Sequence, residues 1–123
     1  MIKIGTKVKV TDNSGALVAQ VIGIIKGGRQ GFVQPGGLVK VTIKKARADG
    51  NVHEHEVHVG IVVRVKKNYL RDDGTSIRFD DNAIVLIDPE TKEPKATRIF
   101  GPVAREVKLY GFDKVTQLAQ EVV

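Results

Sequence analysis

The chain has 123 residues, a length typical of one domain, and 41% of them are hydrophobic, enough for a modest aliphatic core. It has no cysteine, so disulfides, thiolate chemistry and cysteine-based zinc sites are excluded. Its formal net charge of +6 favours a polyanionic partner, most often nucleic acid; a charge that serves only solubility is the alternative. The longest nearly apolar run, Leu17 to Ile25, is too short to span a bilayer, and the N-terminal residues lack a signal-peptide pattern. We therefore expect no membrane partner.

Strict alternation of polar and apolar residues predicts strands in the first part of the chain. Residues 3–12 alternate and lead into the turn Asp12-Asn13-Ser14-Gly15, where Asx side chains and a glycine favour reversal. Residues 17–25 predict a strand that is buried on both faces. The glycine-rich residues 26–37 predict a loop or a loose ribbon. Residues 38–45 alternate cleanly and predict a further strand.

An Asp-Gly turn at 46–51 separates this strand from a long predicted strand at 52–65. A hairpin around Asp72-Asp73-Gly74 follows, and then a short buried strand at 83–88. Residues 89–94 turn the chain again.

The last part of the chain changes to a helical period. Pro102 is expected as the first residue of a short helix, with Gly111 as its stop, and Asp113 as the N-cap of a second helix. The second helix is predicted by apolar residues at i, i+3, i+4 and i+7, namely Val115, Leu118, Ala119 and Val122. Its apolar side, Val115, Leu118 and Val122, is expected to pack on the strands. Successive strands without crossover helices predict an antiparallel meander, which a small barrel would close.

Two further segments contain residue types that are typical of binding sites. The glycine-rich segment 26–37 matches neither the P-loop nor the dinucleotide fingerprint, so a hairpin tip and a backbone contact to RNA remain its two interpretations. The run VHEHEVH at 52–58 would place His53 and His55 on one strand face and His58 on the other, which suits either a weak metal site or an exposed strand edge.

No catalytic constellation stands out. Asp80 and Asp81 are adjacent on a strand and would point to opposite faces, and Ser14 beside Asp12 has no histidine nearby in the sequence. We expect no enzyme activity, no cofactor and no required metal.

The strongest local signal is the hairpin from residue 64 to 78. Its cations outnumber the two acids of its turn and are candidates for RNA phosphates: Arg64, Lys66, Lys67, Arg71 and Arg78. A second candidate patch lies beside the Asp49-Gly50 turn: Lys44, Lys45 and Arg47. We expect contacts to phosphate and 2′-hydroxyl groups without a base code. The alternative is an ordinary solvated face.

Four stretches together form a known pattern: DNSGA at 12–16, GIVVRVKK at 60–67, DGTSIRFDDNAIVLI at 73–87 and TRIFGPVARE at 97–106. The chain resembles the universal large-subunit ribosomal protein family called L-fourteen, in its bacterial or organellar form. The resemblance covers essentially all 123 residues. It implies a mainly β fold: a closed five-stranded antiparallel β-barrel with a projecting β-ribbon and two short C-terminal α-helices. The chain would be a single domain, 1–123, with the barrel at about 1–96 and the helical region at about 97–123.

The resemblance also implies a function. The protein would be a structural constituent of the large ribosomal subunit that binds large-subunit rRNA near the intersubunit face. It would also contact small-subunit rRNA and neighbouring large-subunit proteins. The location would be the ribosome in a bacterial cytoplasm, with a mitochondrion or plastid as the alternative. Two other classes stay open: a stand-alone RNA-binding β-barrel, and a protein-interaction module.

A ribosome-silencing factor is a further partner that the resemblance implies. The family surface for it corresponds to Thr97, Arg98 and Lys114, which match, and Gln117, where a small hydroxyl residue is usual. Arg98 could bind RNA instead. Other departures are Leu70 in place of the first arginine of a pair, HEHE at 53–56, Gln120 in place of a common proline, and a ribbon with only Arg29.

Overall fold

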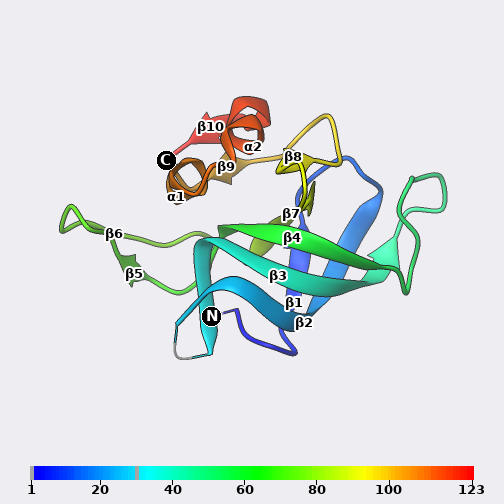
Figure 1. The fold of residues 1–123 in the computed structure, drawn as a ribbon, viewed down its shortest axis with the longest axis horizontal. Coiled ribbons are helices and arrows are strands. Elements are labelled where there is room, and N and C mark those ends of the chain that lie inside the picture. Colours follow the sequence, from blue (N-terminus) through cyan, green and yellow to red (C-terminus); the bar gives the residue numbers. More distant parts are fainter. Residues whose placement is uncertain (1, 30) are drawn as a thin grey trace.

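The computed structural model describes residues 2–29 and 31–123, and its fold is mainly β (Figure 1). Five strands form a ring in which each is hydrogen-bonded to two neighbours: β1 (Lys7–Val10), β2 (Ala16–Arg29), β3 (Phe32–Ala46), β4 (Val57–Arg64) and β7 (Ala83–Asp88). A short β8 (Glu93–Pro94) pairs with the other edge of β7. The two short helices expected near the C-terminus are present: α1 (Glu106–Leu109) and α2 (Asp113–Leu118).

A wholly antiparallel arrangement was expected, but one pair of neighbouring strands in the ring is parallel. β1 pairs with β7 in parallel, with Lys9 opposite Ala83 and Val10 opposite Ile84. The reason is topological: each antiparallel neighbour reverses direction, so a closed ring with an odd number of strands must contain at least one parallel pair.

Two ribbons project from one end of the ring (Figure 1). The first is the continuation of β2 and β3 beyond the ring, where Arg29 pairs with Phe32, and it confirms the predicted ribbon. The second is formed by β5 (Tyr69–Leu70) and β6 (Ser76–Ile77). A separate parallel pair, β9 (Pro102–Val103) with β10 (Glu121–Val122), lies beside the helices.

Two apolar clusters explain which strands are fully buried. One fills the ring and includes Val39, Val41 and Ile43, the inward side of the predicted alternation. The other lies between β4, β7 and the C-terminal region, where Phe112 and Val115 pack. β4 and β7 therefore contribute side chains to both clusters, which accounts for the continuous apolar run at 83–88.

The expectation of a doubly buried strand at 17–25 was wrong. Leu17 and Ile22 are each 43% exposed and Ile25 is 53% exposed, because within residues 2–29 and 31–123 no second layer covers the outer side of β2. The C-terminal helices cover β4 and β7 instead. This leaves aliphatic side chains at the surface of the first half of the chain.

Three further expectations were corrected. The strand expected at 52–65 begins only at Val57, because residues 53–56 form a turn in which His55 has φ of 69°. His53 and His55 therefore do not share a strand face. Pro102 lies in β9 and not at a helix start.

In α2, Asp113 is the first helical residue and Phe112 is the N-cap, so Asp113 is not the N-cap. Only Val115 of its apolar side is buried, and Leu118 and Val122 are 37% and 44% exposed. The helix ends at Leu118, so Val122 leaves the helical period and lies in β10.

The predicted turn at 12–15 makes a close backbone contact with the turn at 47–51. Gly15 has φ of 106°, and a Cβ added there would lie 2.6 Å from the Cα of Gly50. The contact is closed by hydrogen bonds from the Arg47 amide to the Gly15 carbonyl (2.7 Å) and from the Asn51 amide to the Ser14 carbonyl (3.1 Å). Neither turn can shift without breaking these bonds.

We expect Gly15→Ala to destabilise the protein more than Gly5→Ala. Both positions have a positive φ, which costs an alanine roughly 1–2 kcal/mol, but a Cβ at Gly5 meets nothing within 4 Å. The steric clash at Gly15 adds to the backbone cost. Urea unfolding of the two variants measures the difference, and equal losses would contradict the close contact.

Candidate nucleic-acid interface

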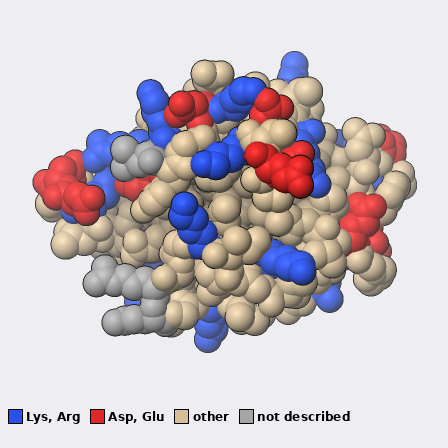
Figure 2. Space-filling model, in the orientation of Figure 1, with Lys and Arg blue, Asp and Glu red and all other residues tan. Residues whose placement is uncertain are grey.

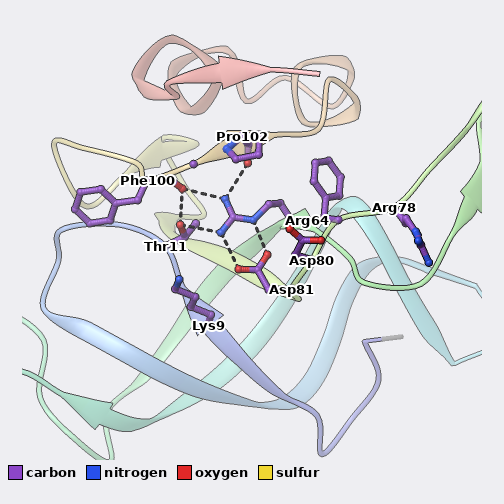
Figure 3. A pocket seen from close by; sticks show the side chains of 10 residues that line it. Lys9, Thr11, Arg64, Arg78, Asp80, Asp81, Phe100 and Pro102 are labelled. Carbon is purple, nitrogen blue, oxygen red and sulfur yellow. Dashed lines mark hydrogen bonds and ion pairs between the residues drawn. The ribbon is translucent and has the colours of Figure 1, made fainter.

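The guanidinium of Arg64 lies inside the protein and not on its surface. The residue is 5% exposed at the end of β4. Its Nε donates to Asp81 Oδ1 (2.8 Å), and Nη2 donates to Asp81 Oδ2 (3.2 Å) and to Thr11 Oγ1 (3.1 Å). Nη1 donates to the carbonyls of Phe100 and Pro102, both at 2.9 Å (Figure 3). All three guanidinium nitrogens are thus satisfied internally.

The residues around Arg64 are hydrogen-bonded to one another and leave space for its guanidinium. The Thr11 hydroxyl donates to the Phe100 carbonyl (2.5 Å), and the Phe100 amide donates to the Thr11 carbonyl (2.8 Å). Gly101 has φ of 78°, and a Cβ added there would lie 2.6 Å from Nη1 of Arg64. This geometry supports a structural role for Arg64 in place of the predicted contact with RNA.

Arg71 is also engaged within the protein. Its Nε lies 2.6 Å from Glu106 Oε1, and its Nη2 donates to Glu106 Oε2 (3.2 Å) and to the carbonyl oxygen of Val123 (2.7 Å). The Tyr69 hydroxyl donates to Glu106 Oε2 (3.0 Å). Burial, together with the charge of Glu106, raises the pKa of Tyr69 to about 12. These contacts hold the β5–β6 ribbon against α1.

The turn of the same ribbon is closed by its own acid. Asp73 accepts hydrogen bonds from the amide and hydroxyl of Thr75 and pairs with Arg105 at 2.5 Å. The hydrogen bonds from Thr75, and to a smaller extent the contact with Arg105, hold the pKa of the Asp73 carboxyl well below its usual range. Asp73 therefore stabilises the turn at Asp72-Asp73-Gly74.

Three of the five hairpin cations remain exposed: Lys66, Lys67 and Arg78. The turn at Lys66 is fixed by its amide, which donates to Asn82 Oδ1 (2.8 Å). In Figure 3 the side chain of Arg78 points away from the Arg64 network. Arg78 and Lys9 both line an open hollow of about 340 Å³, together with Phe79 and Phe100. Lys9 was not among the predicted site residues, because nothing in the sequence places β1 beside the hairpin.

The second predicted patch is exposed as well. Lys44 and Lys45 lie near the end of β3, and Arg47 follows in the turn that contacts Gly15. Arg47 Nε lies 3.4 Å from Asp49 Oδ1, a pair whose two side chains are mostly solvent-exposed. Such a pair is weak and leaves Arg47 available to another anion.

The four residues of the predicted partner surface lie close together around α2 and the segment before β9. Asn13 organises this segment, because its Oδ1 accepts from the amides of Thr97 (3.0 Å) and Arg98 (2.9 Å). Thr97, Lys114 and Gln117 line a shallow hollow of about 320 Å³, with Arg98 next in the chain and exposed. Lys114 is paired with Glu93, a residue that sequence reasoning did not include.

The histidine run offers no metal site among the described residues. His58 Nε2 contacts Glu56 Oε1 (3.0 Å), and its Nδ1 contacts Lys95 Nζ (2.9 Å). Within residues 2–29 and 31–123 no group of three or more His, Asp or Glu side chains is arranged to hold a metal. Over the same residues no helix has the length and apolar character needed to cross a membrane.

These features define the class of protein: a small basic β protein with exposed cations on a scaffold of strands. A family model described as Ribosomal protein L14p/L23e matches residues 1–123, the whole chain. The chain therefore belongs to this family, as the sequence resemblance indicated, and has a structural role in the large ribosomal subunit. The family is structural and not enzymatic.

We expect Arg64→Met to lower the free energy of unfolding by about 3–5 kcal/mol, the usual cost of removing one partner of a buried ion pair. The change leaves Asp81 and two backbone carbonyls without their donor. Urea unfolding measures the loss. Arg78→Met, an exposed cation of the same hairpin, is the control and should change stability by no more than about 0.5 kcal/mol. Similar small effects for both variants would contradict the buried network.

Proposed function

We propose that the protein binds large-subunit rRNA through exposed cations on its rigid β scaffold and contributes to the face of the subunit that meets the small subunit. The observation that supports this proposal is that some basic side chains are buried in ion pairs while others are exposed. Arg64 and Arg71 are buried in internal pairs, whereas Lys44, Lys45, Lys66 and Arg78 are exposed and belong to no ion pair identified among the described residues. Exposed lysines and arginines attract the phosphates of RNA.

The proposed contacts come from two places on the scaffold. Lys66, Lys67 and Arg78 flank the β5–β6 ribbon, which the Arg71–Glu106 pair holds in place. Lys44, Lys45 and Arg47 lie where the two turns at 12–15 and 47–51 contact each other. Cations held on rigid elements lose less conformational freedom on binding. Arg98 is a further candidate, shared with the partner surface below.

The ribosome in this proposal is bacterial, with an organellar ribosome as the alternative. Sedimentation of the tagged protein in a sucrose gradient tests the assignment first. Recovery in the large-subunit fraction is the expected result. A protein that binds RNA but stays at the top of the gradient would favour a stand-alone RNA-binding module, and one that does neither would favour a protein-interaction module.

We expect Lys66→Ala/Lys67→Ala to weaken binding to a large-subunit rRNA fragment and to flatten its salt dependence. Loss of two phosphate contacts should reduce the slope of log K against log salt by about 2. Lys92→Ala/Lys108→Ala, two exposed lysines of the C-terminal half, is the matched control of equal net charge. An unchanged slope in the first variant would exclude these lysines from the interface.

A second proposed function concerns a ribosome-silencing factor, which would dock at Thr97, Arg98, Lys114 and Gln117. The shallow hollow and the exposed Arg98 support this proposal because a convex partner with acidic groups would fit both. Docking would require Lys114 to exchange Glu93 for an acid of the partner. The two acids compete for one ammonium group, so the net gain at Lys114 is smaller than at Arg98.

We expect Arg98→Ala to weaken binding of a cognate silencing factor about tenfold and Lys114→Ala to weaken it less, each mainly through slower association. Lys108→Ala serves as the control for the loss of one exposed charge. Binding kinetics at two salt concentrations give both rates. Tight binding of the wild type that neither change affects would reject the docking site; if the wild type does not bind, Gln117→Ser is the first change to test.

A further inference from the structure

Positive charge outside the ion pairs of the described residues extends from the 44–47 patch across β1 and the centre of β3. β1, β2 and β3 are neighbours in the ring and contain seven basic residues but no Asp or Glu. Among them Lys7, Lys9, Lys40, Lys44 and Lys45 are exposed, and no ion pair of the described residues includes any of these five. We call these five the outer lysine face.

The strand register puts Lys7, Lys9 and Lys40 on one side of the sheet, and a register shift in the β2–β3 pairing at Val18 leaves both Lys44 and Lys45 exposed. Lys9 is opposite Val18, which is opposite Lys45, so the two lysines are separated by two strand spacings, about 10 Å. Lys7 lies two residues before Lys9 on β1, about 7 Å away, and Val8 between them points into the core.

Lys40 lies on the same outer side, because its neighbours Val39 and Val41 are fully buried. It is opposite Gly23 of β2, which has no side chain to cover it. In Figure 2 the basic side chains over β2 and β3 stand among uncharged ones, while the acidic side chains gather toward the two ends and the upper part of the view.

The uncharged side chains between these lysines include exposed aliphatic ones as well as the polar Gln20 and Thr42, which are opposite each other on β2 and β3. Leu17, Ile22 and Ile25 of β2 are all more than 40% exposed. Protein-binding surfaces are typically enriched in aromatic residues and arginine at their centres and depleted in lysine. β1 and β2 contain no aromatic residue. A spread of lysines over aliphatic side chains instead suits a ribose-phosphate backbone, with its regularly spaced anions and its sugar carbon atoms.

We propose that the outer lysine face binds the backbone of an A-form RNA duplex, with Lys7, Lys9 and Lys40 as phosphate contacts. A-form RNA has a wide, shallow minor groove that proteins recognise by shape. The outer side of three adjacent strands is broad enough to meet the phosphates on both rims of such a groove. The inference rests on the proposed rRNA binding and extends it from the hairpin and the 44–47 patch to β1 and the centre of β3.

The first experiment compares Lys7→Gln/Lys9→Gln/Lys40→Gln with Lys92→Gln/Lys95→Gln/Lys108→Gln, a control that removes equal charge from the C-terminal half. The probe is a random-sequence RNA duplex of about 16 base pairs, the span that double-stranded RNA-binding domains cover. The outer-face variant should lose about tenfold or more in affinity at 100 mM salt, and its salt slope should fall by about 2–3. The control should lose much less, and a DNA duplex of the same sequence should bind the wild type less tightly.

A second variant changes charge on this face without removing a lysine. A Cβ at Gly23 would lie 3.8 Å from the Cβ of Lys40, an ordinary contact, and Gly23 does not have a positive φ. Gly23→Glu therefore places a carboxylate beside Lys40, and Gly23→Gln is its neutral match. Gly23→Glu should weaken RNA binding, whereas Gly23→Gln should leave it within about twofold of the wild type.

Three outcomes would overturn the inference. One is that the outer-face variant binds RNA like the wild type while Lys66→Ala/Lys67→Ala does not, in which case the proposed function stands without this face. Another is that RNA binding is unaffected while binding to poly-L-glutamate is lost, which would make the face a site for an acidic protein. The third is equal affinity for RNA and DNA duplexes, which would remove the recognition of shape. Failure of the wild type to enter large subunits would count against the proposed function itself.

Discussion

The buried guanidinium of Arg64 is the contact on which the arrangement of the second half of the chain depends. It contacts three segments far apart in the sequence: Thr11 after β1, Asp81 before β7, and the segment with the carbonyls of Phe100 and Pro102. A buried charge is tolerated only where its partners replace the lost water, and here all three nitrogens have partners. The segment at 100–102 is thereby fixed against the ring, and β9, which begins at Pro102, starts from a defined position. Asn13 holds the backbone at Thr97 and Arg98, because its Oδ1 accepts hydrogen bonds from both amides.

The sequence was informative where periodicity and burial agree. The alternation in residues 38–45 and the apolar run at 83–88 predicted β3 and β7, and the turns at 12–15 and 46–51 lie where Asx and glycine residues place them. It was misleading for residues 17–25, because an apolar run does not say whether a second layer covers it. The parallel pair was not predicted, although a closed ring with an odd number of strands requires one. The pairing of β1 with β7 joins residues more than seventy positions apart, and local sequence patterns do not reveal such a pairing.

The candidate site was harder to predict than the fold, for a reason that concerns charge. Arg64, Lys66 and Arg71 look equivalent in the sequence, but only Lys66 keeps its side chain exposed. The partners that remove Arg64 and Arg71 from the surface are Asp81 and Glu106, 17 and 35 positions away. The Arg64 partners Phe100 and Pro102 act through backbone carbonyls, and this role leaves no mark in residue type. Glu106 in addition holds Tyr69, whose raised pKa reports the same burial.

The distribution of charge along the whole chain indicates which strands have unpaired lysines, whereas the charges of the hairpin alone do not. Residues 1–60 contain nine Lys or Arg and four Asp or Glu, and one of these acids, Asp12, is buried. Desolvation raises the pKa of Asp12, and its two carboxylate oxygens accept hydrogen bonds from Ser14 and the Leu86 amide, so it does not neutralise the surface lysines. Residues 61–123 contain eleven bases and ten acids, and four ion pairs form there: Arg64–Asp81, Arg71–Glu106, Arg105–Asp73 and Lys114–Glu93. The acid-poor residues 1–60 form β1, β2 and β3, whose lysines face solvent. The balanced residues 61–123 form the ion pairs that hold the β5–β6 ribbon against the C-terminal region. The basic residues thus have different physical roles in the two halves of the chain.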